Sequence, residues 1–434
     1  MAIKQRFPFA LTSIAAFLLP ALALWVRSGY SYAAVLLLIG GVFFLPWWIG
    51  SVRDRKTIVL ALIFLAMGCM WFILSLDTGA GRWDKGSKWI LGAFCLLFVA
   101  QYGPRIDMFV AGLPIGCLGM GLTALWQIFV QGVSRANGYT NAIQWGNTGM
   151  LLACLSAACL VVYWHRKAWW WRMLMLLAIL AALTASLFSE SRGGWVAPVV
   201  AAPFTLIWTR KIAPDKLKLA FVVLAVFVAV FAAGFAATPQ FRDRVAVGVS
   251  EVQRYYSAEE GDTSLGVRLQ QYRLAADMIA EKPWLGWGAH GFVGELENRV
   301  NAGEYSPLMV NFPQIHNDLL DVWVKAGLLG CLLQLALYGW VLYMFWPNPR
   351  RLKGFERPTE RWCDALVVRI MGCLAPICFL VFGSTQPFFN HNSGIMTYVF
   401  YVAVLWAALR RMEREASDDN GNSDQALWRH DAMA

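Results

Sequence analysis

Histidine is the side chain best suited to exchange a proton near neutral pH, and one histidine here stands where a polar segment meets a long apolar one. His316 lies in NFPQIHNDLL and is followed by Asn317 and Asp318, after which the run LLDVWVKAGLL begins. A neutral imidazole can accept a proton from an attacking hydroxyl, and a helix N-terminus favours the neutral form. Two interpretations stay open. His316 is a general base, or it belongs to a capping segment in which Asn317 or Asp318 is the N-cap.

The other four histidines divide between the two sides of the predicted membrane. His391, in TQPFFNHNSG, lies in the last outer loop, so we expect it to join the same cavity as His316. His290, in WGWGAHGF, lies in a glycine-rich outer turn and is more typical of a loop cap. His165 and His430 fall on the cytoplasmic side by the loop charges described below.

Arg192, in FSESRGGW, lies between two apolar segments with almost no loop around it. A charge at that depth is costly unless it faces a water-filled cavity or a partner. The alternatives are an anchor that snorkels to the membrane surface and a salt bridge to Glu190. Because anchoring arginines usually lie on the cytoplasmic side, a functional role is favoured.

Further basic residues are predicted on the same outer side. Arg268 and Arg273, in GVRLQQYR, are five residues apart and do not share one helix face closely, so each alone is more typical of a solvated residue. Arg82, Lys85 and Lys88 form another outer cluster. Together with the arginine of SRGG, these side chains can line a cationic cavity that binds a diphosphate, because guanidinium forks match phosphate oxygens.

No pattern in the chain favours a metal or a cofactor. Of the nine cysteines, all but Cys363 lie within apolar segments, which argues against a disulfide framework and a cysteine-ligated metal. Glu259, Glu260 and Asp262, in EEGD, are more typical of a solvated loop than of a cation site. The HExxH, Walker and GxSxG motifs do not occur. We therefore expect no metal and no cofactor.

The elements that must position these residues are membrane helices. The chain has 434 residues, of which 58% are hydrophobic and 15% charged, whereas a soluble domain carries about 25% charged residues. Apolar runs long enough to cross a bilayer recur from end to end, which predicts an all-α polytopic membrane protein with about twelve transmembrane helices. The predicted spans are 8–26, 32–50, 57–76, 89–103, 107–130, 146–164, 170–189, 194–209, 218–237, 318–346, 365–385 and 394–410.

Lysine and arginine concentrate in every second loop between these spans. By the positive-inside rule those loops and both termini are cytoplasmic, which also accounts for the net charge of +10 without nucleic acid. The sequence then predicts four regions. They are helices 1 to 9 over 1–237, a large outer loop with helices of its own over 238–317, helices 10 to 12 over 318–414, and a disordered cytoplasmic tail over 415–434.

The order of three motifs resembles the O-antigen ligase family. SRGGW in a short outer loop is followed by VRLQQYRLAADMIAEKPWLGWGAHGF in the long loop, and then by HNDLL at the start of the next span. PWLGWG, at 283–288, matches a loop segment of the wider superfamily, which also includes O-antigen polymerases and bacterial O-oligosaccharyltransferases. The resemblance covers about 185–325 in motif and the whole chain in topology.

The resemblance implies an activity and a location. Such enzymes sit in the inner membrane of Gram-negative bacteria and take a glycan from undecaprenyl diphosphate on the periplasmic face. Ligases give it to a sugar hydroxyl of the lipid A-core oligosaccharide, by inverting transfer without a metal. Carried over by motif, His316, Arg192 and Arg268 are the catalytic residues. The substrate-binding candidates are Arg82, Lys85, Lys88, Arg273, Asn317, Asp318 and His391.

Three alternatives stay open. The chain can be an O-antigen polymerase or a protein O-oligosaccharyltransferase of the same superfamily, since no motif separates these from a ligase. A transporter with twelve spans is less favoured, because transporters tend to show repeated halves and interrupted helices at the midplane.

Overall fold

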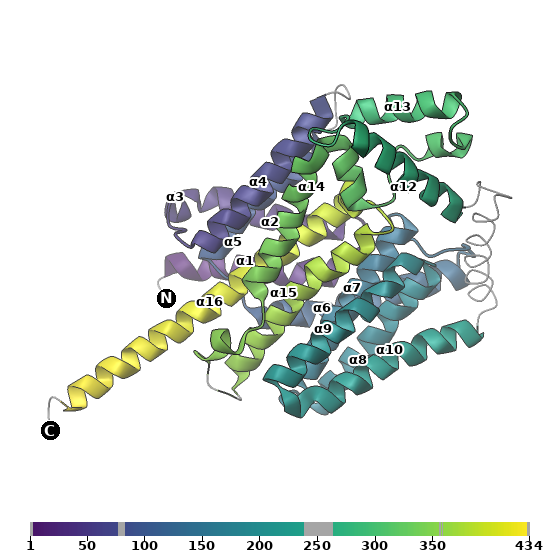
Figure 1. The fold of residues 1–434 in the computed structure, drawn as a ribbon. Coiled ribbons are helices and arrows are strands. Elements are labelled where there is room, and N and C mark those ends of the chain that lie inside the picture. The colour runs from purple at the N-terminus through teal and green to yellow at the C-terminus, as the bar shows by residue number, and fades with distance from the viewer. Residues whose placement is uncertain (1–2, 77–82, 238–263, 356, 358, 432–434) are drawn as a thin grey trace.

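The computed structural model describes residues 3–76, 83–237, 264–355, 357 and 359–431, and it is a bundle of helices without a strand among these residues (Figure 1). The first half contains α1 (Ile3–Leu22), α2 (Gly29–Phe43), α3 (Leu45–Trp48), α4 (Arg55–Leu76), α5 (Asp84–Gln101), α6 (Ile106–Phe129), α7 (Ala142–Tyr163), α8 (Trp169–Phe188), η1 (Arg192–Val196) and α9 (Ala197–Ile212). The second half contains η2 (Pro214–Lys216), α10 (Leu217–Ala237), α12 (Ser264–Glu281), α13 (Ala289–Asn301), η3 (Pro307–Asn311), α14 (Asp318–Phe345), η4 (Pro349–Leu352), α15 (Glu360–Gly383), η5 (Phe388–Asn390) and α16 (Asn392–Asp431).

Within the described residues, eight helices are long and apolar enough to cross a membrane, so the chain is a multi-pass membrane protein, as predicted. They are α4, α6, α7, α8, α10, α14, α15 and α16. Each of the twelve predicted spans overlaps at least one helix, but the span 32–50 is divided between α2 and α3, α9 has only 16 residues, and α5 begins with Asp84, Lys85 and Lys88 close together. The number of twelve crossings and the side on which each loop lies stay predictions.

The centre of the bundle is formed by α7, α15 and the apolar first part of α16, where almost all residues are buried. Small residues allow this close packing. A Cβ at Gly116 of α6 would lie 1.9 Å from the carbonyl oxygen of Pro20 on α1, and a Cβ at Gly372 of α15 would lie 2.1 Å from the ring of Phe345 on α14. Close backbone approach of this kind is how helices associate in lipid, where burial of apolar surface gives little driving force.

The polar segment before α14 forms an arch, residues 264–315, at one end of the bundle, and α12, α13 and η3 belong to it (Figure 1). The predicted helix that ends before Pro283 is α12. The arch encloses a second apolar core, which contains Val267, Leu274, Ala275, Met278, Phe292, Leu296, Met309, Ile315 and, from α14, Val324. It therefore rests on the start of α14 through apolar contacts of its own.

The span predicted over 318–346 is not a continuous helix. α14 is broken at Gly327, where φ is 69° and ψ is −171°. A Cβ at this residue would lie 2.0 Å from the carbonyl oxygen of Trp284 in the arch, so both the backbone angle and the space require glycine. The prediction of one uninterrupted span was wrong because periodicity alone does not show where another segment enters a helix.

The PWLGWG segment enters this break and bonds to the backbone on both sides of it. Three backbone hydrogen bonds join the two segments, from Trp287 to Val324 (2.8 Å), from Gly288 to Lys325 (2.9 Å) and from Leu328 to Pro283 (2.8 Å). An interrupted helix at membrane depth needs such partners, because lipid offers none to the freed N–H and C=O groups. The arch is therefore joined to α14 by backbone hydrogen bonds on both sides of the break.

α16 continues past residue 415 to Asp431 and extends beyond the bundle (Figure 1), while the disorder expected of this tail stays a prediction. Pairs one helical turn apart support the extension. Arg411 lies 2.7 Å from Glu415, and the Ser417 hydroxyl donates to the Glu413 carbonyl at 2.9 Å. Arg361 on α15 pairs with Asp419. The polar composition alone did not reveal these contacts.

Candidate active site

The N-terminus of α14 is the point where the arch and the loop between α15 and α16 meet. Asn317 is the N-cap of α14, because its Oδ1 accepts hydrogen bonds from the backbone of Leu319 (3.1 Å) and Leu320 (3.2 Å). This selects Asn317 over Asp318 as the N-cap. It also gives Asn317 a structural task, while its predicted substrate contact stays a prediction, and it places His316 one residue before the N-cap.

His316 is partly buried and is held by α12. Its Nδ1 lies 2.7 Å from Oε1 of Gln271, and its backbone N–H donates to the same oxygen at 3.2 Å. The ring of Phe312 lies against the imidazole, with 5.5 Å between centroids. The hydroxyl of Tyr272 lies 3.2 Å from the His316 carbonyl oxygen and 2.9 Å from that of Ser384. The histidine is therefore fixed by its ring and by its backbone.

One face of α12 supplies the groups around His316. Arg268, Gln271 and Tyr272 stand at positions i, i+3 and i+4 of the helix, which share a face. Sequence reasoning compared Arg268 with Arg273 and missed Gln271 and Tyr272, although the i, i+3, i+4 spacing in VRLQQY was the signal that would have found them.

The environment keeps the His316 imidazole neutral. Burial, first, and the positive charge of Arg268, second, lower its pKa from 6.5 to about 4. Asp321 acts in the opposite direction, and His391 adds a small further lowering. The pKa of His391 is lowered as well, by burial and then by the charge of Lys85. Both imidazoles are therefore bases rather than cations near neutral pH.

A buried polar network lies beside the two histidines. Asp321, which is 1% exposed, accepts hydrogen bonds from the Lys325 ammonium (2.6 Å), the Ile315 backbone (2.8 Å) and the Asn390 amide (2.8 Å). The side-chain oxygen Oδ1 of Asn390 in turn accepts a bond of 3.0 Å from the Lys85 ammonium on α5. Lys85 is thereby tied to the His316 end of α14, where its charge also reaches His391.

Asp318, a predicted substrate-binding residue, is buried at 3% exposure. Its Oδ1 accepts a backbone hydrogen bond from Phe389 at 3.3 Å, and Gly383 at the end of α15 packs against it. This carboxylate holds the α15–α16 loop against α14, and its contact with a substrate stays a prediction.

Arg192 begins η1 at the same end of the bundle. A Cβ at Gly193 would lie 2.1 Å from the Thr385 hydroxyl, and one at Gly194 would lie 2.3 Å from Oδ1 of Asn147 on α7. Thr385 follows Ser384, which accepts the Tyr272 hydroxyl bond. The two glycines therefore let the SRGG segment pack directly against the loop that adjoins the His316 site, and Arg192 is partly exposed there.

Glu190, the alternative partner considered for Arg192, lies beside Arg135. Their side chains approach to 3.8 Å, and the same guanidinium donates to the Ser189 carbonyl at 2.9 and 2.7 Å. Glu190 has a φ of 53°, a left-handed conformation uncommon for a residue with a side chain. Arg135 therefore holds the turn between α8 and η1 through the two residues Ser189 and Glu190, which precede Arg192.

Other predicted site residues lie elsewhere. Arg273 is exposed and stands near Tyr305, whose pKa it lowers against the larger raising effects of burial and Asp277. Lys88 pairs with Asp84 on its own helix. His290 is exposed in the first turn of α13, whose N-cap is Gly288, so the expected capping role was wrong. Arg82 and the EEGD acids at 259–262 lie outside the described residues.

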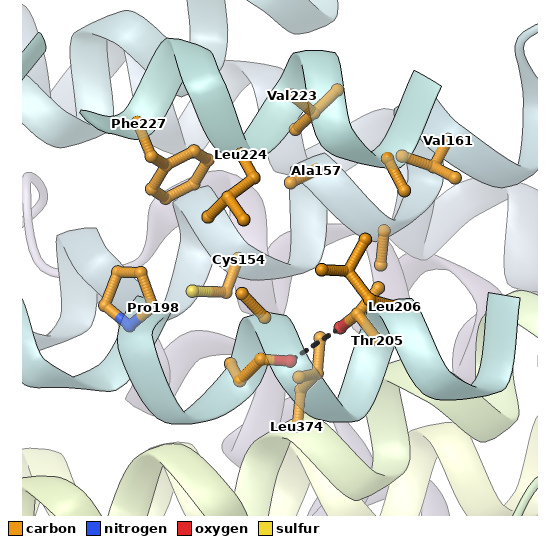
Figure 2. Close-up of a pocket in the computed structure, with 14 residues that line it drawn as sticks. Cys154, Ala157, Val161, Pro198, Thr205, Leu206, Val223, Leu224, Phe227 and Leu374 are labelled. Atoms are coloured by element: carbon orange, nitrogen blue, oxygen red, sulfur yellow. Dashed lines mark hydrogen bonds between the residues drawn. The ribbon is translucent and has the colours of Figure 1, made fainter. Parts of the chain in front are cut away.

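An apolar pocket of about 60 Å³ lies between α7, α9, α10 and α15 (Figure 2). Cys154, Pro198, Leu206, Phe227 and Leu374 are among the side chains that surround it. None of the candidate site residues lines it, but Pro198 stands on α9 just after η1. This pocket offers hydrocarbon surface and no chemistry of its own.

The described residues offer no group of three or more histidine, cysteine, aspartate or glutamate side chains that would hold a metal ion. The polar groups of the site around His316 are instead a neutral imidazole, the guanidinium of Arg268 beside it and hydrogen-bonded amides. Such a site can accept a proton and stabilise negative charge on a substrate.

Two comparisons bear on the identity of the chain. Residues 177–335 match the family model described as O-Antigen ligase, and this stretch contains SRGG, α12, PWLGWG and HNDLL. An uncharacterized protein of Haemophilus influenzae is 25% identical over 379 residues, which cover 86% of this chain and 92% of the relative. The match over residues 177–335 supports an O-antigen ligase-type family for this chain, whose wider superfamily holds membrane glycosyltransferase-like enzymes.

Proposed function

We propose that the chain is an O-antigen ligase of the inner membrane, which transfers a glycan from undecaprenyl diphosphate to a sugar hydroxyl of lipid A-core on the periplasmic face. The observation that carries the proposal is the neutral His316 beside Arg268, at the end of the bundle where the SRGG segment also lies. The family match over these motifs supports it.

In the proposed reaction the acceptor hydroxyl attacks the anomeric carbon of the lipid-linked glycan. The new carbon–oxygen bond forms as the bond to the diphosphate breaks, and undecaprenyl diphosphate leaves with the electron pair. His316 takes the proton of the hydroxyl, for which a neutral imidazole is required. A single displacement from the opposite side of the sugar inverts the anomeric configuration.

Arg192 and Arg268 would hold the diphosphate and stabilise the charge that grows on it. Guanidinium groups suit this task because they stay charged and bind phosphate oxygens in pairs. Lys85 and His391 stand at the edge of the same network and are proposed to contact the substrates. The leaving group is already activated as a diphosphate, so positioning and charge stabilisation are what the protein needs to supply.

The apolar pocket of about 60 Å³ is proposed to contact part of the prenyl chain of the donor. It begins near Pro198, a few residues along the chain from Arg192, and its lining is apolar over α7, α9, α10 and α15. A prenyl chain whose diphosphate lies at Arg192 would have hydrocarbon surface available next to its head group. This arrangement favours a lipid-linked donor over a soluble one.

The test is transfer by purified protein in detergent, with undecaprenyl-diphosphate-linked glycan, lipid A-core and a chelator, and without nucleotide. A product of lipopolysaccharide size supports the proposal. A longer lipid-linked glycan, with nothing joined to lipid A-core, would make the chain a polymerase. A glycan joined to added acceptor protein in place of lipid A-core would make it a protein glycosyltransferase, and the absence of every product would favour transport.

A further inference from the structure

Gln271 is a fully buried amide that the proposed reaction does not yet use. Its side chain is 1% exposed and makes three hydrogen bonds to the segment before α14. Nε2 donates to the Gln314 carbonyl at 3.1 Å, while Oε1 faces the His316 backbone N–H at 3.2 Å and the His316 Nδ1 at 2.7 Å. An amide so placed has one orientation available to it.

Two backbone groups determine that orientation. The Gln314 carbonyl can only accept a hydrogen bond, so it must face the NH₂ group of Gln271. The His316 backbone N–H can only donate, so it must face the amide oxygen. Both requirements are met by the same side-chain orientation, and reversing the amide would break both bonds at once.

The amide oxygen then decides where the imidazole proton lies. In a neutral imidazole one nitrogen donates and the other accepts, and the hydrogen bond made by one of them selects the tautomer. Oε1 of Gln271 can only accept, so Nδ1 of His316, at 2.7 Å, must carry the hydrogen. Nε2 is left with the lone pair.

We propose that Gln271 is a positioning residue that fixes the Nδ1–H tautomer of His316 and so makes Nε2 the atom that accepts the proton of the acceptor hydroxyl. The tautomer follows from the hydrogen bonds alone, whereas its use in catalysis rests on the proposed transfer reaction. The structure thereby assigns the reacting nitrogen as well as the reacting residue.

The charged groups around His316 leave this assignment intact. Arg268 on α12 and His391 beside α16 disfavour a second proton on the ring, while Asp321 on α14 favours one. Burial has the largest effect and also opposes the cation, so the ring stays neutral near pH 7. Under these conditions the tautomer decides which nitrogen is basic.

The direct test is the ¹⁵N spectrum of histidine-labelled full-length protein in lipid nanodiscs at pH 7, with the His316 signals identified by their loss in His316→Ala. We expect a protonated Nδ1 and an unprotonated Nε2. Protonation at Nε2, or at both nitrogens, would overturn the inference. This readout does not depend on activity, so it stands apart from any failure of the proposed transfer reaction.

Two variants connect the tautomer to function. Gln271→Met keeps the side-chain size but removes the acceptor, so we expect a mixed tautomer and a kcat lowered at least about tenfold, since a histidine in the wrong tautomer can lose up to about 10⁴-fold in a serine-protease triad. Gln270→Met is the matched control, because Gln270 accepts a bond of 2.9 Å from the Ser306 backbone in the same arch. A purely structural role would lower both variants alike and leave the His316 spectrum of Gln271→Met unchanged, which would contradict the proposal.

Discussion

The two halves of α14 bury different kinds of side chain. Before Gly327 the helix carries Asp318, Asp321 and Lys325, which are buried and bonded to the arch and to the α15–α16 loop. After Gly327 it has no charged side chain and buries apolar ones such as Leu337 and Phe345 against its neighbours. Burying charges costs free energy that apolar packing does not. The comparison shows where the fold places costly polar groups, which is next to the candidate site.

The largest expected effect on stability comes from the charged pair of the first half. Asp321→Asn leaves the Lys325 ammonium buried without its carboxylate, and removing one partner of a buried pair costs about 3–5 kcal/mol. Lys88→Met is the matched control, because Lys88 and Asp84 are also four residues apart, but Asp84 is largely exposed. We expect that change to cost at most about 1 kcal/mol in thermal unfolding in detergent. Equal losses would contradict the larger contribution expected of the buried Asp321–Lys325 pair.

The next prediction separates two arginines of the same helix. Arg268→Ala is expected to lower glycan transfer by about 10²–10³-fold, as removal of one stabilising donor does in other active sites. Arg273→Ala should stay near wild type, because its side chain is exposed beside Tyr305 and away from His316. Initial rates at saturating donor measure both, and a comparable loss for the two variants would contradict the site as described.

Gly327→Ala tests the break in α14 against the second half of the same helix. The left-handed backbone alone costs about 1–3 kcal/mol for a residue with a side chain, and the overlap with Trp284 adds to it. Gly339→Ala is the control, because a Cβ there meets nothing within 4 Å. That change should be neutral or stabilising by up to about 1 kcal/mol. Each variant adds one methyl group to the wild-type protein, and thermal unfolding of the two measures the difference in stability. Equal stability would contradict the strain expected at Gly327.

The smallest effect is the pH dependence. His316 must be neutral to act as a base, and its pKa is lowered to about 4. Transfer should therefore be retained as the pH falls from 7 to about 5 and be lost as it falls through about 4. A kcat/KM profile that declines through 6.5 would show an ordinary imidazole and contradict the buried, Arg268-facing environment.

The free energy of unfolding should also depend on pH. Because the pKa of His316 is lower in the folded state than the usual 6.5, the unfolded chain binds more protons between pH 6.5 and 4. The free energy of unfolding should therefore fall as the pH drops through that window, and His316→Ala should reduce the fall. Thermal unfolding across this range provides the measurement.

The sequence predicted the all-helical fold class and the approximate positions of the long apolar helices, because apolar runs of bilayer length are a strong signal. It also selected His316 and Arg192, whose polar neighbours stand out against apolar surroundings. Gln271 and Asn390 were missed. The spacing from Arg268 places Gln271 on the same helix face, but the groups that the two amides bond, the Gln314 carbonyl and the Asp321 carboxylate, lie 43 and 69 residues away along the chain. The break at Gly327 was missed for the same reason.

The most direct test of the account is the rate of glycan transfer to lipid A-core by His316→Ala beside His290→Ala. Both variants remove one imidazole from the same end of the bundle, but His290 is exposed on α13 whereas His316 is bonded to Gln271. We expect the transfer rate of His316→Ala to fall by about 10²–10⁴-fold, while the variant elutes from size-exclusion chromatography as the wild type does. His290→Ala should transfer glycan at a near wild-type rate. Full transfer by His316→Ala, or an equal loss in His290→Ala, would contradict the assignment of the site.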